Sequence, residues 1–272
     1  MDWEQRMKHE VAFRVLEGHF IERERVAALH VAVGAPDDPD AFVRWFETLR
    51  SIGPGQNDPL FPWLAEKATL SQMKWFLRQE VGGEAGFDDL VALTQVRLPV
   101  VAKLELARNY WDEMGQGHES GMHGPMLDHL ASSMELPDHD VVWESLALGN
   151  LMLGLAANRH YAYQSLGALG VVELTAPARA VCVNDGLKRL GVAGDVRRYF
   201  ALHATLDVRH SETWNRDVLR PLVASNPRVA RPIAEGAWMR LTAGARCFER
   251  YRRELGVPAL AAARPNRLVA QR

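Results

Sequence analysis

The chain reads His203-Ala-Thr-Leu-Asp207-Val-Arg-His210 inside a run, residues 195–223, whose apolar spacing predicts one long helix. At 3.6 residues per turn, positions 203, 207 and 210 point into an arc of about 60° on the helical wheel. One helix would therefore present two imidazoles and a carboxylate toward a common point. Nitrogen and oxygen ligands without thiolate suit iron or manganese, and also zinc. The alternative is a set of exposed histidines that form i,i+4 pairs.

Helical periodicity also covers most of the remaining chain, and no segment shows the alternation that is typical of a strand. Further helices are predicted at residues 3–33, 40–52, 72–81, 98–114, 126–134, 141–169 and 229–255. Ser71 is the expected N-cap of the helix at 72–81, and Thr175-Ala-Pro177 is the expected start of another helix. We therefore expect the all-α class, with a single domain at 1–257 and a flexible tail at 258–272, because no long linker interrupts the pattern.

Composition narrows the class of protein. The 272 residues carry a formal net charge of −2, which gives no bulk attraction to nucleic acid. The two cysteines, Cys182 and Cys247, form no CxxC motif, so neither a disulfide scaffold nor a thiolate metal site is expected. The start, Met1-Asp-Trp-Glu-Gln-Arg, is charged and does not resemble a secretory signal. The apolar stretch at 145–157 is too short to cross a bilayer, so we expect a cytoplasmic protein without a membrane or nucleic-acid partner.

Three acids lie at positions where a charged carboxylate is energetically unfavourable. Glu80 and Glu113 fall at the C-terminal ends of predicted helices, against the helix dipole, and neither has a basic residue three or four positions later. Glu173 lies in an apolar run, where an unpaired carboxylate would be unfavourable if it were buried. With His123 and the 203–210 stretch, the set contains three histidines and four carboxylates. That composition is typical of a dinuclear iron or manganese site in a helical bundle, whereas the alternative for each acid is a solvated surface position.

These residues resemble a known family, the heme-oxygenase-like diiron oxidases and oxygenases, also described as iron-containing redox enzymes. The match consists of Glu113-Met-Gly-Gln-Gly through His123, of Glu173, which lies 30 residues before His203, and of the 203–210 stretch. Upstream, Phe76-Leu-Arg-Gln-Glu80 is similar to the first ligand helix of the family. The resemblance spans roughly residues 70 to 215.

The resemblance implies a heme-oxygenase-like bundle of about seven core helices, two Fe(II)/Fe(III) ions and O2 as a co-substrate. Carried over position by position, the implied metal ligands are Glu80, Glu113, His123, Glu173, His203, Asp207 and His210. Glu84, one turn after Glu80, and Glu105 are alternatives to Glu80. His118 is an alternative to His123, which has the better spacing from Glu113.

The expected activity is that of an O2-dependent non-heme diiron enzyme acting on a small metabolite, amino-acid-like or fatty-acid-like. N-oxygenation, desaturation and oxidative C–C cleavage all fit. Manganese in place of iron, an external electron donor and a homodimer stay open. The alternatives are a metal-free or heme-dependent enzyme of the same fold, for which His19 or His30 would be the candidate heme ligand, and a helical binding protein without activity.

Overall fold

The computed structural model describes residues 2–84, 87–137 and 141–258. These residues form α-helices joined by short 3-10 and π-helical turns, with one isolated antiparallel bridge between Met114 and Met122. The α-helices are α1 (Trp3–Ala32), α2 (Pro39–Ile52), α3 (Leu60–Glu66), α4 (Leu70–Gly83), α5 (Phe87–Thr94), α6 (Val100–Glu113), α7 (His123–Ser133), α8 (Trp143–Ala157), α9 (Ala162–Arg189), α10 (Arg198–Thr213), α11 (Arg220–Ser225) and α12 (Ala230–Leu255). The all-α prediction is confirmed. The predicted tail lies outside the described residues from 259 onward.

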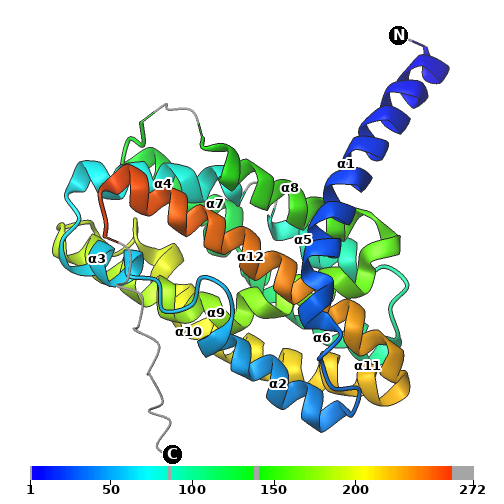
Figure 1. Ribbon diagram of the computed structural model, residues 1–272. Helices are drawn as coiled ribbons and strands as arrows, with labels where there is room; N and C mark the ends of the chain where they lie inside the picture. The colour runs from blue at the N-terminus through cyan, green and yellow to red at the C-terminus, as the bar shows by residue number, and fades with distance from the viewer. Residues whose placement is uncertain (1, 85–86, 138–140, 259–272) are drawn as a thin grey trace, which may run out of the picture.

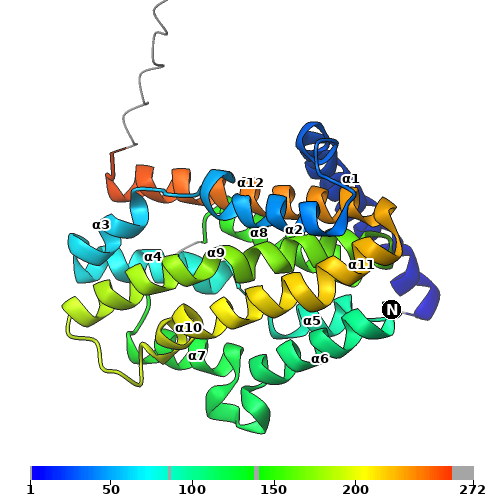
Figure 2. The same cartoon turned by 90° about the horizontal axis from the view of Figure 1, so that it is seen from below.

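Helix α9 runs through the middle of the bundle, with α12 packed on one side and α10 on the other (Figures 1 and 2). Two glycines allow α9 and α12 to come unusually close. A Cβ at Gly167 would lie 1.8 Å from the carbonyl oxygen of Ile233, and a Cβ at Gly236 would lie 1.8 Å from that of Gln164. Any side chain at either position would force the helices apart, so these glycines set the depth at which α9 is buried.

The central position of α9 also explains its composition. Together with the preceding turn, Arg159–Arg189 is the one helix in the described part of the chain that is long and apolar enough to cross a membrane. Its most apolar window is 61% buried inside the fold. A helix that is apolar on most sides is expected where neighbours cover it on both faces, as α10 and α12 do here. The sequence of α9 is therefore that of a core helix.

Several helix boundaries differ from those that the sequence predicts, and α7, for example, begins at His123 instead of at residue 126. Helix α4 begins at Leu70, and its cap is Thr69 rather than Ser71. The Thr69 hydroxyl accepts from the Gln72 backbone, and the Gln72 side chain accepts from the Thr69 backbone. This capping box satisfies two helix-end donors, whereas Ser71 would have satisfied one. Farther along, the single helix predicted at 141–169 is two helices, because the chain turns at Asn158 between α8 and α9.

The predicted helix start at Thr175 is wrong, because α9 continues through Pro177 without a break. The Thr175 hydroxyl donates to the carbonyl of Val171, four residues earlier, which is a helix-interior contact and not a cap. The run predicted at 195–223 is helical only from Arg198 onward, and it is not uniform. Helix α10 passes into a π-helical turn, Trp214–Leu219, before α11. The short helix α5 was not predicted at all.

Helix α1 is the one element that extends well outside the body of the bundle (Figure 1). Its N-terminal half carries large apolar side chains that are exposed, among them Val11 at 61%, Phe13 at 67% and Leu16 at 65%. Its C-terminal half packs against α12 and α8 and buries Ile21 completely. The projecting half thus exposes apolar side chains that no described residue covers, beside charged residues such as the Arg14–Glu10 ion pair.

Candidate metal centre

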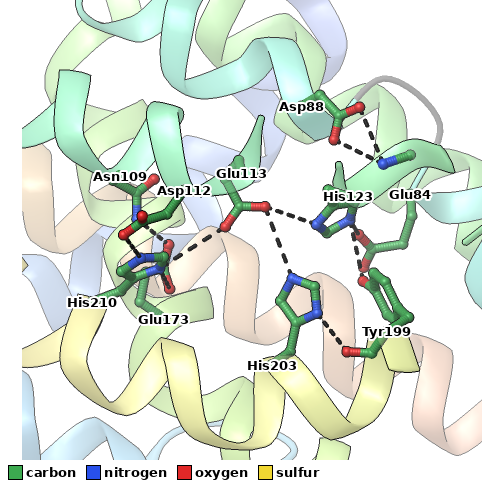
Figure 3. Close-up of polar contacts among 11 residues, drawn as sticks. Glu84, Asp88, Asn109, Asp112, Glu113, His123, Glu173, Tyr199, His203 and His210 are labelled. Carbon is green, nitrogen blue, oxygen red and sulfur yellow. Dashed lines mark hydrogen bonds and ion pairs between the residues drawn. The ribbon is translucent and has the colours of Figure 1, made fainter. Parts of the chain in front are cut away.

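Two groups of buried side chains each bring three potential ligand atoms within 4.8 Å of one another. The first, called the His123 triad here, consists of Glu113, His123 and His203. The second, the His210 triad, consists of Glu113, Glu173 and His210. All five side chains are between 3% and 7% exposed. Glu113 belongs to both groups and lies between them, with one oxygen toward each (Figure 3).

A tight loop brings Glu113 and His123 together. Glu113 is the last residue of α6 and His123 the first of α7, and the bridge between Met114 and Met122 closes the loop that separates them. Gly115 makes this closure possible. Its φ is +60°, and a Cβ there would lie 2.4 Å from the backbone of Gly121. The Glu113 Oε2 atom consequently lies 2.9 Å from His123 Nδ1.

The start of α7 is held by a residue from a distant part of the chain. Helix α7 has no side-chain cap of its own at Met122. Both carboxylate oxygens of Asp88, on α5, accept from the backbone N–H of Gly124, at 3.0 and 3.1 Å (Figure 3). Asp88 thus supplies the cap and fixes the helix end that carries His123. Phe87, its neighbour on α5, stacks on the His123 ring at 4.9 Å between centroids.

Hydrogen bonds orient the two imidazoles of α10. His203 Nδ1 lies 2.7 Å from the backbone oxygen of Tyr199, one turn earlier, so this nitrogen donates and Nε2 is left facing Glu113. His210 Nε2 lies 3.2 Å from Asp112 Oδ2. Its other nitrogen, Nδ1, is buried, has no hydrogen-bond partner, and lies 3.4 Å from Glu173 Oε2. Each ring is therefore oriented through one nitrogen while its other nitrogen faces a carboxylate of the triads, Glu113 for His203 and Glu173 for His210, which fits a metal-binding histidine.

Asp207 lies one turn from both histidines of α10 and is 3% exposed. Its Oδ1 atom is buried and has no hydrogen-bond partner. Burial and the neighbouring Glu173 raise the pKa of Asp207 well above its usual range. A buried carboxylate without a donor is unfavourable unless a cation neutralises it. The orphaned Oδ1 of Asp207 and Nδ1 of His210 therefore fit a site that holds metal ions.

The carboxylates and imidazoles strongly shift one another's pKa. Burial alone would lower the pKa of His123, but hydrogen bonds to Glu113 and Glu84 outweigh it and raise that pKa to about 10. Burial would also lower the pKa of His210, but Glu173 and Asp112 outweigh this effect and raise that pKa to about 9. Burial would raise the pKa of Glu113, yet His123 and His203 hold it well below its usual range. Without metal, protons thus take the place of the cations.

The first predicted ligand, Glu80, lies apart from both triads. It is in the last turn of α4 and lines the cavity near Tyr251, and burial and Glu84 raise its pKa to about 7. Glu84, the C-cap of α4, places Oε2 3.4 Å from His123 Nε2. The geometry therefore favours the alternative Glu84, and the assignment of Glu80 as a ligand stays a prediction. The rival Glu105 pairs instead with Arg108 at 2.8 Å.

Other candidates from the sequence lie on the surface, since His118, His19 and His30 are all exposed. The sequence reasoning missed several residues that support the triads. Asn109 Nδ2 donates to Glu173 Oε1 at 2.9 Å, and Tyr199 places its hydroxyl 3.2 Å from His123 Nε2. Tyr199 lies four residues before His203, so its place on the same helix face was a usable signal. Asp88 gave none, because α5 itself was not predicted.

Comparison with known proteins identifies the fold and the family of the chain. Two crystal structures of a CADD-like protein of unknown function from Nostoc punctiforme PCC 73102 are similar to the chain, with TM-scores of 0.59 and 0.58 and 18% and 16% identity. The matches cover 78% and 80% of this chain and 96% of that protein, and they show a shared fold. No curated protein matches the chain. The iron-containing redox enzyme family matches residues 74–245, more than half of the sequence, so the chain belongs to that family.

Proposed function

We propose that the protein is a non-heme diiron oxidase or oxygenase that uses O2 to oxidise a small metabolite. The observation that carries this proposal is the position of Glu113 between two buried triads. A carboxylate shared by two ligand groups is the arrangement by which helical bundles hold a pair of iron or manganese ions. When bound, the ion pair would supply the binding and reduction of O2.

The chain's own residues would hold and shield this pair. His123 and His203 would bind on one side of Glu113, and Glu173 and His210 on the other, with Asp207 available to both from α10. Asp112 and the Tyr199 carbonyl fix the rings of His210 and His203, and Asn109 fixes Glu173. Such outer contacts preserve ligand geometry as charge changes at the metal. Phe87 covers the His123 ring and limits access of water from that side.

The alternatives fit the observations less well. A helical binding protein without activity would leave the polar set on the surface, yet Glu113, Glu173 and His210 are each at most 5% exposed. A heme-dependent enzyme would use His19 or His30 of α1, and both are exposed. A metal-free enzyme would retain the burial of the acids but would leave unexplained the orphaned oxygen of Asp207.

Anaerobic loading with Fe(II), followed by metal analysis and rapid mixing with O2, tests the proposal. We expect about two irons per chain and a transient visible absorption on mixing with O2. His210→Ala removes one ligand of the His210 triad, so about one iron and the transient should be lost. The matched control His118→Ala, an exposed histidine, should behave as the wild type. A wild-type protein that takes up neither iron nor manganese would overturn the proposal.

The remaining expectations are also proposals. We propose a cytoplasmic enzyme with an amino-acid-like or fatty-acid-like substrate and an external electron donor, tested by turnover with and without added reductant. We further propose a homodimer, because the projecting half of α1 exposes Val11, Phe13 and Leu16. Light scattering on the wild type and on Phe13→Glu would show whether this helix joins two copies.

A further inference from the structure

The cavity beside the triads contains two arginines that the metal centre does not use. It has a volume of about 80 Å³, and its lining includes Glu113, His123 and His203 together with Arg179 of α9 and Arg240 of α12. Arg179 follows Glu173 by six residues on α9, about 9 Å along the helix axis. Both arginines line the same cavity as the proposed metal ligands.

Among the described residues, no carboxylate lies within ion-pair distance of either guanidinium. Within the described ranges, Arg179 and Arg240 form no hydrogen bond and no ion pair within 4.0 Å. Arg240 is 9% exposed, and its Nε atom is buried without a partner. Other partly buried arginines are paired, for example Arg246, which lies 2.7 Å from Glu24. A buried guanidinium nitrogen without an acceptor, as at Arg240, is unfavourable, and the partly buried Arg179 also lacks a paired acid, so these two differ from the structural arginines of the fold.

The fold also prepares space and support for both groups. The guanidinium carbon of Arg179 lies 5.9 Å and 5.6 Å from the ring centroids of Phe61 and Phe248. These rings hold the side chain in place while they leave its donors free. At Gly244, one turn after Arg240, a Cβ would lie 2.8 Å from Arg240 Nη1, so the glycine makes room for the group.

The electrostatic surroundings favour a singly charged anion. Burial and the nearby Arg240 lower the pKa of Arg179 to about 10, so Arg179 remains positive at neutral pH. Glu80, Glu84 and Asp207 attract Arg179 but lie beyond ion-pair distance. These acids would repel a dianion such as phosphate more strongly than a carboxylate. The planar fork of a guanidinium also matches a carboxylate.

We propose that Arg179 and Arg240 bind the carboxylate of the substrate and so orient its apolar part toward the metal centre. The apolar walls of the cavity, Phe61, Leu148, Val172, Val183 and Phe248, would contact that part of the molecule. This inference rests on the proposed function, because it takes the cavity to be the substrate site. It selects monocarboxylates from the broader class of small metabolites.

Calorimetric titration of the metal-free protein tests the inference independently of iron. The probes are butanoate, hexanoate and octanoate, each compared with the corresponding neutral primary amide. We expect at least one carboxylate to bind at least about tenfold more tightly than its amide, since only the anion pairs with the guanidiniums. Arg179→Met and Arg240→Met should each weaken binding at least about tenfold. Arg253→Met, an exposed arginine on the same helix as Arg240, should bind as the wild type does.

Circular dichroism would establish that each variant is folded. If Arg240→Met unfolds, Arg240→Lys replaces it in the test; this variant keeps the positive charge and should retain part of the affinity for the carboxylate. The inference is overturned if no carboxylate binds, if the amide binds equally well, or if folded Arg179→Met and Arg240→Met both bind like the wild type. Inorganic phosphate that displaces the carboxylate would also overturn it. Carboxylate binding without iron uptake would instead contradict the proposed function and leave the anion site intact.

Discussion

The two triads share Glu113 but are built from different kinds of structure. The His210 triad joins three helices, with Glu173 in the middle of α9, His210 near the end of α10 and Glu113 at the end of α6. Its supporting residues, Asn109 and Asp112, come from α6 as well. Hydrogen-bonded helix interiors hold their side chains in fixed relative positions. We therefore expect this half of the centre to keep its geometry without metal.

The His123 triad depends on chain ends and a loop. His123 is the first residue of α7, and Glu84, which contacts it, is the C-cap of α4. Their alignment requires the left-handed turn at Gly115 and the cap that Asp88 supplies from α5. Such segments open at lower free energy than helix interiors. We therefore expect the two halves of the centre to differ in rigidity, so that mutations can separate them.

The largest effect should come from Glu113→Gln, because this change removes the carboxylate that both triads share. The amide keeps the shape but not the charge, and it leaves His123 and His203 without their common partner. We expect the iron content to fall below about one-tenth of the wild-type value. Glu119→Gln, an exposed acid in the same loop, is the matched control. A variant that retains about one iron per chain would show that the triads do not depend on a shared ligand.

Gly115→Ala should separate the two halves. A Cβ at this position would meet the backbone of Gly121 at 2.4 Å and would also be strained at a φ of +60°. The loop must then open, which should cost more than about 1 kcal/mol and displace His123 from Glu113. We expect loss of the iron held by the His123 triad and retention of that in the His210 triad, measured by metal analysis.

A second glycine, Gly191, provides a control that separates the effect of backbone strain from that of a steric clash. Gly191 has a φ of +79° but nothing within 4 Å of a Cβ, so Gly191→Ala adds strain without a clash. It should lower the melting temperature and keep both irons. Equal iron loss in the two variants would mean that general destabilisation, and not the loop, controls the His123 triad.

The sequence predicted the ligands that helix α10 supplies better than those that depend on loops and helix ends. Periodicity alone placed His203, Asp207 and His210 on one face of a helix, and all three are buried there. The resemblance implied Glu80, with Glu84 as the alternative, and periodicity could not separate the two because residues four apart lie on the same helix face. Both are in α4 or at its end, yet only Glu84 approaches His123.

Other misses have similar physical causes. Helix α5 has only eight residues and follows a glycine-rich stretch, so its periodicity was too short to indicate a helix, and Asp88 was missed with it. Pro177 predicted a helix start, but tertiary packing carries α9 through it. Arg179 and Arg240 are far apart in sequence, and only the crossing of α9 and α12 brings them to one cavity.

The smallest expected effect is a pH dependence of the metal-free protein. Against the opposing effect of burial, Glu113 and Glu84 raise the pKa of His123 to about 10, and Glu173 and Asp112 raise that of His210 to about 9. A folded-state pKa above the unfolded value of about 6.5 stabilises the protein fully at lower pH, and this stabilisation is lost as the pH rises through the folded-state value. The free energy of unfolding should therefore fall between pH of about 6.5 and 9, by at most about 1.4 kcal/mol per pH unit for each imidazole.

Thermal denaturation with and without Mn(II), across this pH window, checks the prediction. Metal binding requires neutral imidazoles and releases their protons, so the stabilisation that Mn(II) provides should grow with pH. His123→Gln should reduce the pH dependence of the metal-free protein more than His210→Gln, because the pKa of His123 is raised further. His118→Gln, the exposed control, should leave it unchanged. If metal-free stability is level or rises over this window, then the triads do not hold protonated imidazoles, and protons do not substitute for the missing cations.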